Sequence, residues 1–131
     1  MKTSKDAGIG ADQLSLVAAS GYGLVTQDRA EAAAIRTVLG PRAAEVPVLS
    51  IKAGIGNNGA GSGAIEFIAT TLAMHHNTIP AAINSAPIDP ACGLKLPTAG
   101  PTDAKIGYAL STAFALTGGQ CAALVIKRFG D

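Results

Sequence analysis

A glycine-crowded turn near the middle of the chain constrains the fold more than any other feature. Ser50 to Glu66 reads SIKAGIGNNGAGSGAIE, with five glycines between an apolar run and a stretch of helical spacing. Val46 to Ile51 predicts a strand, and Gly61 to His76 predicts a helix. Glycines at this density let a backbone turn sharply and approach its neighbours closely. The segment therefore predicts an α/β unit with a tight strand-to-helix junction.

The N-terminal part adds a strand and a helix, and the chain as a whole predicts the order β-α-β-α-β-β. Leu14 to Ala19 is a short apolar run typical of a buried strand. Asp28 and Glu31 have capping-box spacing, which predicts a helix from residue 28 to Leu39 that stops before Pro41. In the helix after the glycine turn, residues at helical spacing predict the buried face: Ile65, Ile68, Ala69, Leu72 and His76.

The C-terminal part predicts a turn-rich connection and then a hairpin. Asn77 to Pro101 is rich in Pro, Asn and Ala, which predicts an extended connection with a short strand at Ala81 to Ile83. Ile106 to Phe114 and Gln120 to Phe129 predict two strands joined through Thr117-Gly118-Gly119. The expected fold class is therefore α/β, with helices packed on a mixed sheet.

Composition predicts one domain over residues 1–131. Of the 131 residues 48% are hydrophobic and 15% charged, enough for one core but too short for two. A net charge of +1 gives no electrostatic reason to expect nucleic acid or an anionic membrane as a partner. No apolar run follows Met1 to Asp6, so we expect no signal peptide and a cytoplasmic location. Cys92 and Cys121 are then expected to be reduced thiols with packing roles.

Several segments together resemble one known family. Ser50 to Glu66 resembles the active-site loop of β-ketoacyl synthases, S-T-K-S-x-x-G-H-x-x-G-A-A-G-A-x-E. Val17 to Gly40 resembles a second segment of that family, and the resemblance extends over nearly the whole chain through Ile79 to Asn84, Pro87 to Cys92 and Ala122 to Arg128. It implies the C-terminal half of a thiolase-like fold.

The resemblance also implies that the catalytic residues have changed. The two histidine positions of the family fall on Ser20 and Asn57, while a supporting lysine and glutamate are retained as Lys52 and Glu66. A hydroxyl or a carboxamide does not take up a proton near pH 7 as an imidazole does. The family's G-F-G-G-T-N gate corresponds to Phe114 to Cys121, with one additional residue. The chain thus resembles chain-length-factor-like homologues, which are non-catalytic.

One segment matches a second motif. Gly54-Ile55-Gly56-Asn57-Asn58-Gly59 is G-x-G-x-x-G after an expected strand, as in dinucleotide-binding turns. That motif expects an acidic residue about 20 positions later, and Asn77 to Ala86 contains neither Asp nor Glu. The family resemblance gives the glycines another role, because Gly59, Gly61 and Gly63 would let the helix pack tightly. A dinucleotide-binding module stays as the less favoured alternative.

For function, the resemblance implies a ketosynthase-like protein of fatty-acid or polyketide-type metabolism with a structural or partner-binding role. It belongs to an acyltransferase family but is expected to be inactive alone. The alternative is the C-terminal half of a split synthase whose nucleophilic cysteine comes from another chain, and a natural half and a fragment of a longer protein both stay open. Expected partners are a second copy, covering the helix face of Ile65, Ile68 and Leu72, or a ketosynthase N-terminal half, and acyl carrier protein. No cofactor or metal is implied.

Overall fold

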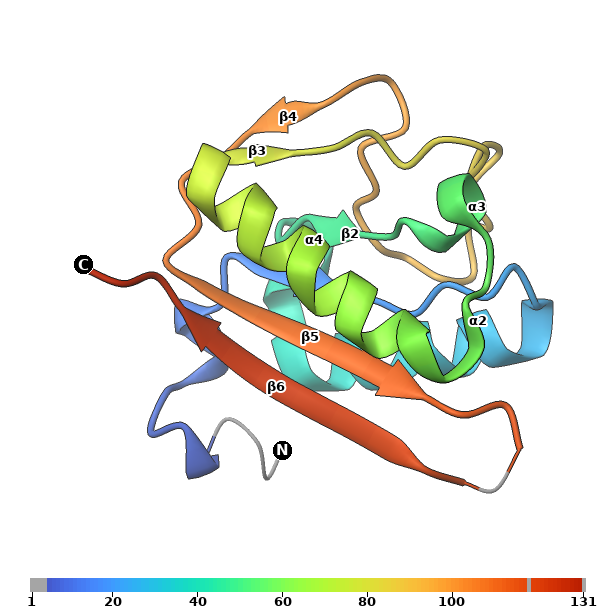
Figure 1. Ribbon diagram of the computed structural model, residues 1–131, viewed down its shortest axis with the longest axis horizontal. Coiled ribbons are helices and arrows are strands. Elements are labelled where there is room, and N and C mark those ends of the chain that lie inside the picture. The colour runs from blue at the N-terminus through green and yellow to red at the C-terminus, as the bar shows by residue number, and fades with distance from the viewer. Residues whose placement is uncertain (1–4, 118, 131) are drawn as a thin grey trace.

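The computed structural model describes residues 5–117 and 119–130 and consists of a mixed sheet between two helices (Figure 1). The expected α/β class and element order are confirmed, with additional short elements. The helices and strands are η1 (Ala11–Gln13), β1 (Leu16–Ala18), α2 (Val25–Leu39), η2 (Gly40–Ala44), β2 (Val48–Leu49), α3 (Lys52–Ile55), η3 (Gly59–Gly61), α4 (Ser62–His76), β3 (Thr78–Ile79), β4 (Thr102–Asp103), β5 (Tyr108–Phe114) and β6 (Cys121–Lys127).

The main sheet has the strand order β2-β1-β5-β6. β1 runs parallel to both β2 and β5, with Val17 opposite Val48 on one side and Leu110 on the other. β6 returns antiparallel to β5, which confirms the expected hairpin. Gly118, in the expected turn, lies outside the described residues.

Two apolar cores lie on opposite faces of this sheet, because side chains alternate along a strand. Val17 points to the α2 side and joins Ile35 and Leu39 in one cluster. Leu16 and Ala18 point to the α4 side, where they join a second cluster with Ala73, Met74 and Ile79. Figure 1 shows α4 crossing in front of the sheet and α2 behind it. Burial on both faces is the reason why β1 reads as a continuous apolar run.

Helix α2 begins earlier than the capping pattern predicts, and its two acidic residues have another role. The helix starts at Val25, so Asp28 lies inside the first turns. Helical side chains point back toward the N-terminus, and the Asp28 carboxylate accepts hydrogen bonds from the backbone N–H groups of Tyr22 and Gly23, both at 2.9 Å. The expected capping box is therefore wrong. The carboxylate fixes the loop after β1 instead.

The inner face of α4 also differs from the prediction. Ile68 and Leu72 are 55% and 52% exposed, and His76 is exposed as well. Three buried residues of the helix are polar, Ser62, Glu66 and Thr70, and the other two are Ala73 and Met74. The predicted face is right at Ala69, which packs against the core, and wrong at Ile68, Leu72 and His76. Apolar periodicity did not identify the polar residues of the buried face, because their partners come from the fold. The hydroxyl of Thr70, for example, donates to the carbonyl of Glu66 at 2.7 Å.

The connection after α4 holds its strand earlier than expected. β3 lies at Thr78–Ile79 and pairs antiparallel with β4 at Thr102–Asp103, whereas the predicted strand at Ala81 to Ile83 is absent and Ile83 is 57% exposed. The pairing joins segments far apart in the sequence, so local composition did not identify it. The short helix α3 was missed for a similar reason, since its four residues carry no recognisable period.

Tight packing of the glycine turn is confirmed at one of the three expected positions. A Cβ added at Gly63 would lie 3.2 Å from the Cβ of Ala113 on β5, which fixes the close approach of α4 to the sheet. A Cβ at Gly59 or Gly61 would meet no atom within 4 Å. Gly59 has φ +56°, which glycine adopts easily and other residues rarely do. Glycine is therefore needed here for the turn conformation and not for close packing.

We expect Gly63→Val to lower the free energy of unfolding by about 1–3 kcal/mol, because the larger side chain overpacks against Ala113. Gly61→Val is the matched control, since this position has open space and a φ of −79° that valine can adopt. Urea unfolding of both variants measures the difference. Equal losses at the two positions would show that close packing is not the reason for Gly63.

Candidate functional site

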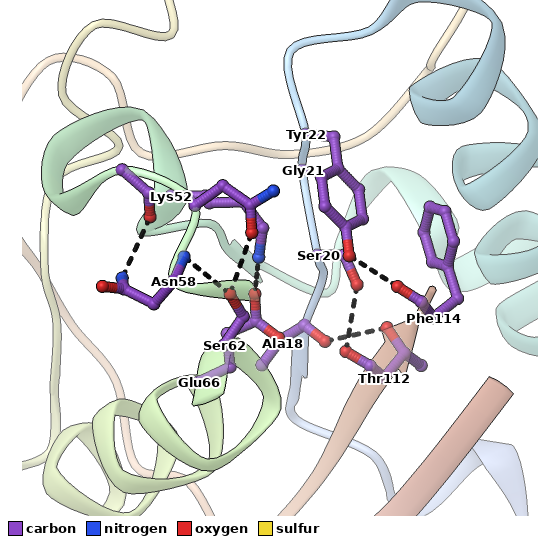
Figure 2. A network of polar contacts seen from close by, with 12 residues as sticks. Ala18, Ser20, Gly21, Tyr22, Lys52, Asn58, Ser62, Glu66, Thr112 and Phe114 are labelled. Atoms are coloured by element: carbon purple, nitrogen blue, oxygen red, sulfur yellow. Dashed lines mark hydrogen bonds and ion pairs between the residues drawn. The ribbon is translucent and has the colours of Figure 1, made fainter. Parts of the chain in front are cut away.

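The candidate site lies where β1 and β5 end, beside the start of α4 (Figure 2). Tyr22, in the loop after β1, donates from its hydroxyl to the carbonyl of Phe114 at 2.5 Å. Their rings also meet edge to face with centroids 5.0 Å apart. The hydroxyl of Ser20 donates to the carbonyl of Thr112 at 3.4 Å. These contacts fasten the loop to the end of the sheet.

A carboxylate on α2, that of Glu31, also holds the loop after β1. Glu31 accepts from the backbone N–H groups of Ser20 and Gly21 at 2.8 and 3.0 Å. The hydroxyl of Thr112 lies 3.1 Å from one oxygen of the same carboxylate and 3.0 Å from the carbonyl of Ala18. Hydrogen bonds to a charged acceptor are stronger than those between neutral groups, so Glu31 fixes the loop that carries Ser20.

Lys52 and Glu66 form a buried ion pair below the glycine turn, as the retained pair implied. Their side chains are 5% and 4% exposed. Burial raises the pKa of the Glu66 carboxyl above its ordinary value, and the ammonium group of Lys52 offsets only part of this effect. The second carboxylate oxygen of Glu66, Oε2, has no hydrogen-bond partner among the described residues. The Lys52 nitrogen also lies 4.7 Å from the centroid of the Tyr22 ring, which connects the pair to the loop after β1.

Asn57 lies on the exposed part of the turn, and its side chain is engaged in local hydrogen bonds. Its carbonyl oxygen Oδ1 accepts from the hydroxyl of Ser62 and from the N–H of Gly59, both at 3.1 Å. The Ser62 hydroxyl in turn accepts from the N–H of Asn58 at 3.0 Å. These bonds hold the turn against the first residue of α4. They give the amide an anchoring role in the loop.

A groove of ≈ 600 Å³ opens between the turn, Tyr22 and the tip of the β5–β6 hairpin. Asn57, Ser62 and Glu66 line one side, and Phe114 lines the other. Ser20 is 1% exposed and is not among the lining residues. The structure thus brings Asn57 and Glu66 to one groove and leaves Ser20 buried beside it.

The remaining candidates lie apart from one another. Cys121 is exposed and lines the groove, so its expected packing role in the last strand is wrong. Cys92 is half-buried in the connection after α4, where burial raises the pKa of its thiol. His75 and His76 are exposed at the C-terminal end of α4. Among residues 5–117 and 119–130, no group of His, Cys, Asp and Glu side chains is arranged to hold a metal ion.

The G-x-G-x-x-G segment does not form the single turn that a dinucleotide site requires. Gly54 lies within α3, Gly59 begins η3, and α4 starts only at Ser62. A short helix therefore separates the strand from the long helix, and the long helix does not begin on the motif. This geometry does not support the dinucleotide-binding alternative.

Tyr22 and Ser62 were missed in the sequence as site residues, and Phe114 was noted only as part of the expected gate. Tyr22, Ser62 and Phe114 hold the loop, the turn and the hairpin to one another. Tyr22 is one of only two tyrosines and lies three residues after the end of an apolar run at Ala19, which could have indicated it. The roles of Ser62 and of the Phe114 carbonyl depend on segments that meet only in the fold, so no local pattern marks them.

A comparison with protein families identifies the chain. Residues 1–86 match the family described as beta-ketoacyl synthase, C-terminal domain. The chain belongs to this family. The family resemblance noted in the sequence is therefore confirmed.

Individual relatives support the same conclusion. The chain is 35% identical over 116 residues to the tetracenomycin polyketide synthase ketoacyl synthase alpha subunit of Streptomyces glaucescens, covering 88% of this chain and 27% of that protein. It is 33% identical over 132 residues to a 3-oxoacyl-[acyl-carrier-protein] synthase 2 of Coxiella burnetii, covering 100% of this chain and 32% of the relative. The chain thus spans less than a third of the length of these curated relatives.

Solved ketosynthase structures have the same architecture. The structure described as the ishigamide ketosynthase/chain length factor matches with a TM-score of 0.88 at 28% identity, over 97% of this chain and 31% of that chain. A type II polyketide synthase acyl-carrier protein in complex with its ketosynthase, AntDE:AntF, matches with a TM-score of 0.89 at 28% identity, over 95% of this chain and 30% of that chain. The expected thiolase-like fold is therefore confirmed. Within the described residues, no helix has both the length and the apolar character needed to cross a membrane.

We expect Lys52→Met to lower the free energy of unfolding by about 3–5 kcal/mol near neutral pH, because Glu66 is left as an uncompensated buried charge. The Glu66 pKa is already raised, so protonation relieves this charge at low pH and the loss grows as pH rises through the raised pKa. Urea unfolding at about pH 5 and about pH 8 measures the difference.

The double variant Lys52→Met, Glu66→Leu is the control, since it removes both charges and should recover most of the loss. A single variant as stable as the parent at the higher pH would show that the pair is not important for the fold. A loss of equal size at both pH values would contradict the role of Glu66 ionisation.

Proposed function

We propose that the chain is a non-catalytic, partner-binding member of the ketosynthase family in fatty-acid or polyketide-type metabolism, with residues 1–131 forming one domain. The observation that carries this proposal is the set of side chains at the groove. Asn57 is held by Ser62 and Gly59 and offers a carboxamide, which does not transfer protons near neutral pH.

The surroundings of Ser20 support the same proposal. If Ser20 and Asn57 occupy the family's histidine positions, neither supplies the proton transfer that an imidazole gives. Ser20 is buried, and its hydroxyl is directed to the Thr112 carbonyl rather than to a basic side chain. An activated serine needs an adjacent general base. Glu31 contacts the Ser20 backbone and not its hydroxyl, so it does not fill this role.

The outer side of α4 is the partner surface in this proposal. Ile68 and Leu72 are more than half exposed on one side of the helix, and Phe67 is 38% exposed. Ile68 and Leu72 are four residues apart and therefore neighbours on the helix surface, and exposed apolar side chains that lie together favour an interaction site. A ketosynthase N-terminal half is the partner we favour for it, and the names of the similar structures, a ketosynthase/chain length factor and a ketosynthase with acyl carrier protein, support ketosynthase and carrier-protein partners. Coverage of the same surface by a second copy is the simpler alternative.

The buried ion pair favours a second candidate function, a split synthase whose cysteine comes from another chain. Lys52 and Glu66 are kept below the turn at the cost of burying two charges. Glu66 also lines the groove, and its buried Oε2 oxygen, without a hydrogen-bond partner among the described residues, leaves an unsatisfied acceptor in the residue below the turn. In this alternative Asn57 and Ser20 keep hydrogen-bonding roles only.

We expect the isolated chain to show no decarboxylation or condensation of acyl thioesters above buffer. The variant Ser20→His, Asn57→His should also be inactive alone, because removing one member of a catalytic unit removes most of its rate. Release of carbon dioxide from malonyl thioester is the measurement. Turnover by the parent chain alone would contradict the proposal. Turnover that appears only when a cysteine-bearing N-terminal half is added to the parent would favour the split synthase.

We expect Leu72→Lys to abolish co-purification with a ketosynthase N-terminal half, because a charge is then buried in the apolar contact. Val25→Lys is the matched control, since Val25 is 64% exposed at the start of α2 on the opposite face. Affinity capture of the co-expressed half measures both. Retention of the partner by Leu72→Lys would exclude this side of α4 as the contact.

A further inference from the structure

The last strand of the sheet has an open edge. β6 pairs with β5 on one side, and no strand of the described residues pairs with its other side. The opposite edge of the sheet differs, because a bridge to Lys95 continues it beyond β2. An unpaired edge strand presents a row of backbone N–H and C=O groups that can pair with another chain.

β6 lacks the features that normally protect such an edge. It has seven residues, CAALVIK, without proline or glycine and with Lys127 as its one charge. Its register against β5 runs without a bulge from Tyr108 opposite Lys127 to Phe114 opposite Cys121. Natural edge strands are usually short, charged, bulged or interrupted by proline. Leu124, at the centre, is 53% exposed.

The hydrogen bonds to β5 determine which backbone groups face outward. The N–H of Ala115 donates to Gln120 and the N–H of Arg128 donates to Gly107, both at 2.9 Å and both between opposite residues of the ladder. Bonded and non-bonded pairs alternate along an antiparallel ladder. The backbone groups of Ala122, Leu124 and Ile126 therefore form hydrogen bonds with β5. The outward groups are those of Cys121, Ala123, Val125 and Lys127.

We propose that two copies of this chain pair through β6, antiparallel, about a twofold axis at Leu124. This register places Ala123 opposite Val125 and Cys121 opposite Lys127. Each of these residues has outward backbone groups, so each pair can form both of its hydrogen bonds. Leu124 lies opposite its own copy in a non-bonded pair, where side chains approach most closely. The two sheets then continue as one.

Charge and symmetry favour a second copy as the occupant. In the twofold register Lys127 faces Cys121 of the other copy, so no like charges lie opposite each other, and the net charge of +1 per chain adds little repulsion. The strand is complementary to itself, which an isologous contact requires. This contact uses the edge of the sheet and not the outer side of α4, so it does not depend on the proposed function.

Charge substitutions at Leu124 test the contact. Leu124→Lys and Leu124→Glu should each weaken self-association at least about tenfold, because two like charges then lie opposite each other. Mixing equal amounts of the two variants should restore association. Val25→Lys is the matched control, since Val25 is 64% exposed at the start of α2, and should leave the dissociation constant unchanged. Leu72→Lys tests the alternative contact on α4. Sedimentation across a dilution series measures the parent chain, each variant and the mixture, and thermal melting confirms that each variant is folded.

The register has its own test. With Cys92 and Cys121 replaced by serine, Leu124→Cys should form a disulfide-linked dimer on mild oxidation, because Cα atoms of a non-bonded pair lie about 4.5 Å apart, within disulfide range. Ala122→Cys is the control, since this residue opposes Ile126 of the other copy and should not link.

A parent chain that stays monomeric at all concentrations overturns the proposal. So does a Leu124→Lys variant that associates like the parent, or a mixture that does not regain association. Loss of association in Leu72→Lys alone would assign the dimer to α4 and would likewise overturn it. The activity and co-purification experiments are unaffected by these outcomes, so a failure here is distinct from a failure of the proposed function.

Discussion

The buried ion pair between Lys52 and Glu66 is the interaction on which the rest of the site depends. It joins the short helix α3 to the long helix α4 across the glycine turn. Two buried charges are favourable only while they remain together, so the pair restricts where the turn can lie. The raised pKa of Glu66 shows that this restriction has a desolvation cost. The Asn57 carboxamide is then held above the pair by Ser62 and Gly59.

Loop anchoring by carboxylates is the second constraint. Asp28 and Glu31 lie on α2, yet they bind the backbone of the loop after β1. Through this loop, α2 positions Tyr22 from one face of the sheet while α4 forms the other wall of the groove. A site at the ends of the strands β1 and β5 thus depends on both layers of helix. This arrangement is consistent with the rule that α/β sheets build their sites at the carboxyl ends of strands.

Two exposed apolar features remain after the site is assembled, and they differ in kind. The outer side of α4 presents side chains, Ile68 and Leu72 above all, whereas β6 presents a backbone edge. Side-chain surfaces are covered by complementary shapes, and strand edges are covered by other strands. The two features can therefore serve different partners at the same time. A ketosynthase half on α4 and a second copy on β6 would not compete for the same atoms.

The sequence by itself determined the α/β class, the order of the main elements, the hairpin, the family and the Lys52–Glu66 contact. The class, the elements and the hairpin depend on local periodicity, which one chain records directly. The family and the Lys52–Glu66 contact come from the resemblance to ketosynthases. Tertiary structure alone decided which side of α4 is buried, because Glu66 and Thr70 are stable inside only through partners that the fold supplies. It also decided that Asp28 holds a loop rather than a helix end, and that Gly63 but not Gly61 packs closely. In each case the deciding atoms come from distant segments, and local sequence carries no information about their distance.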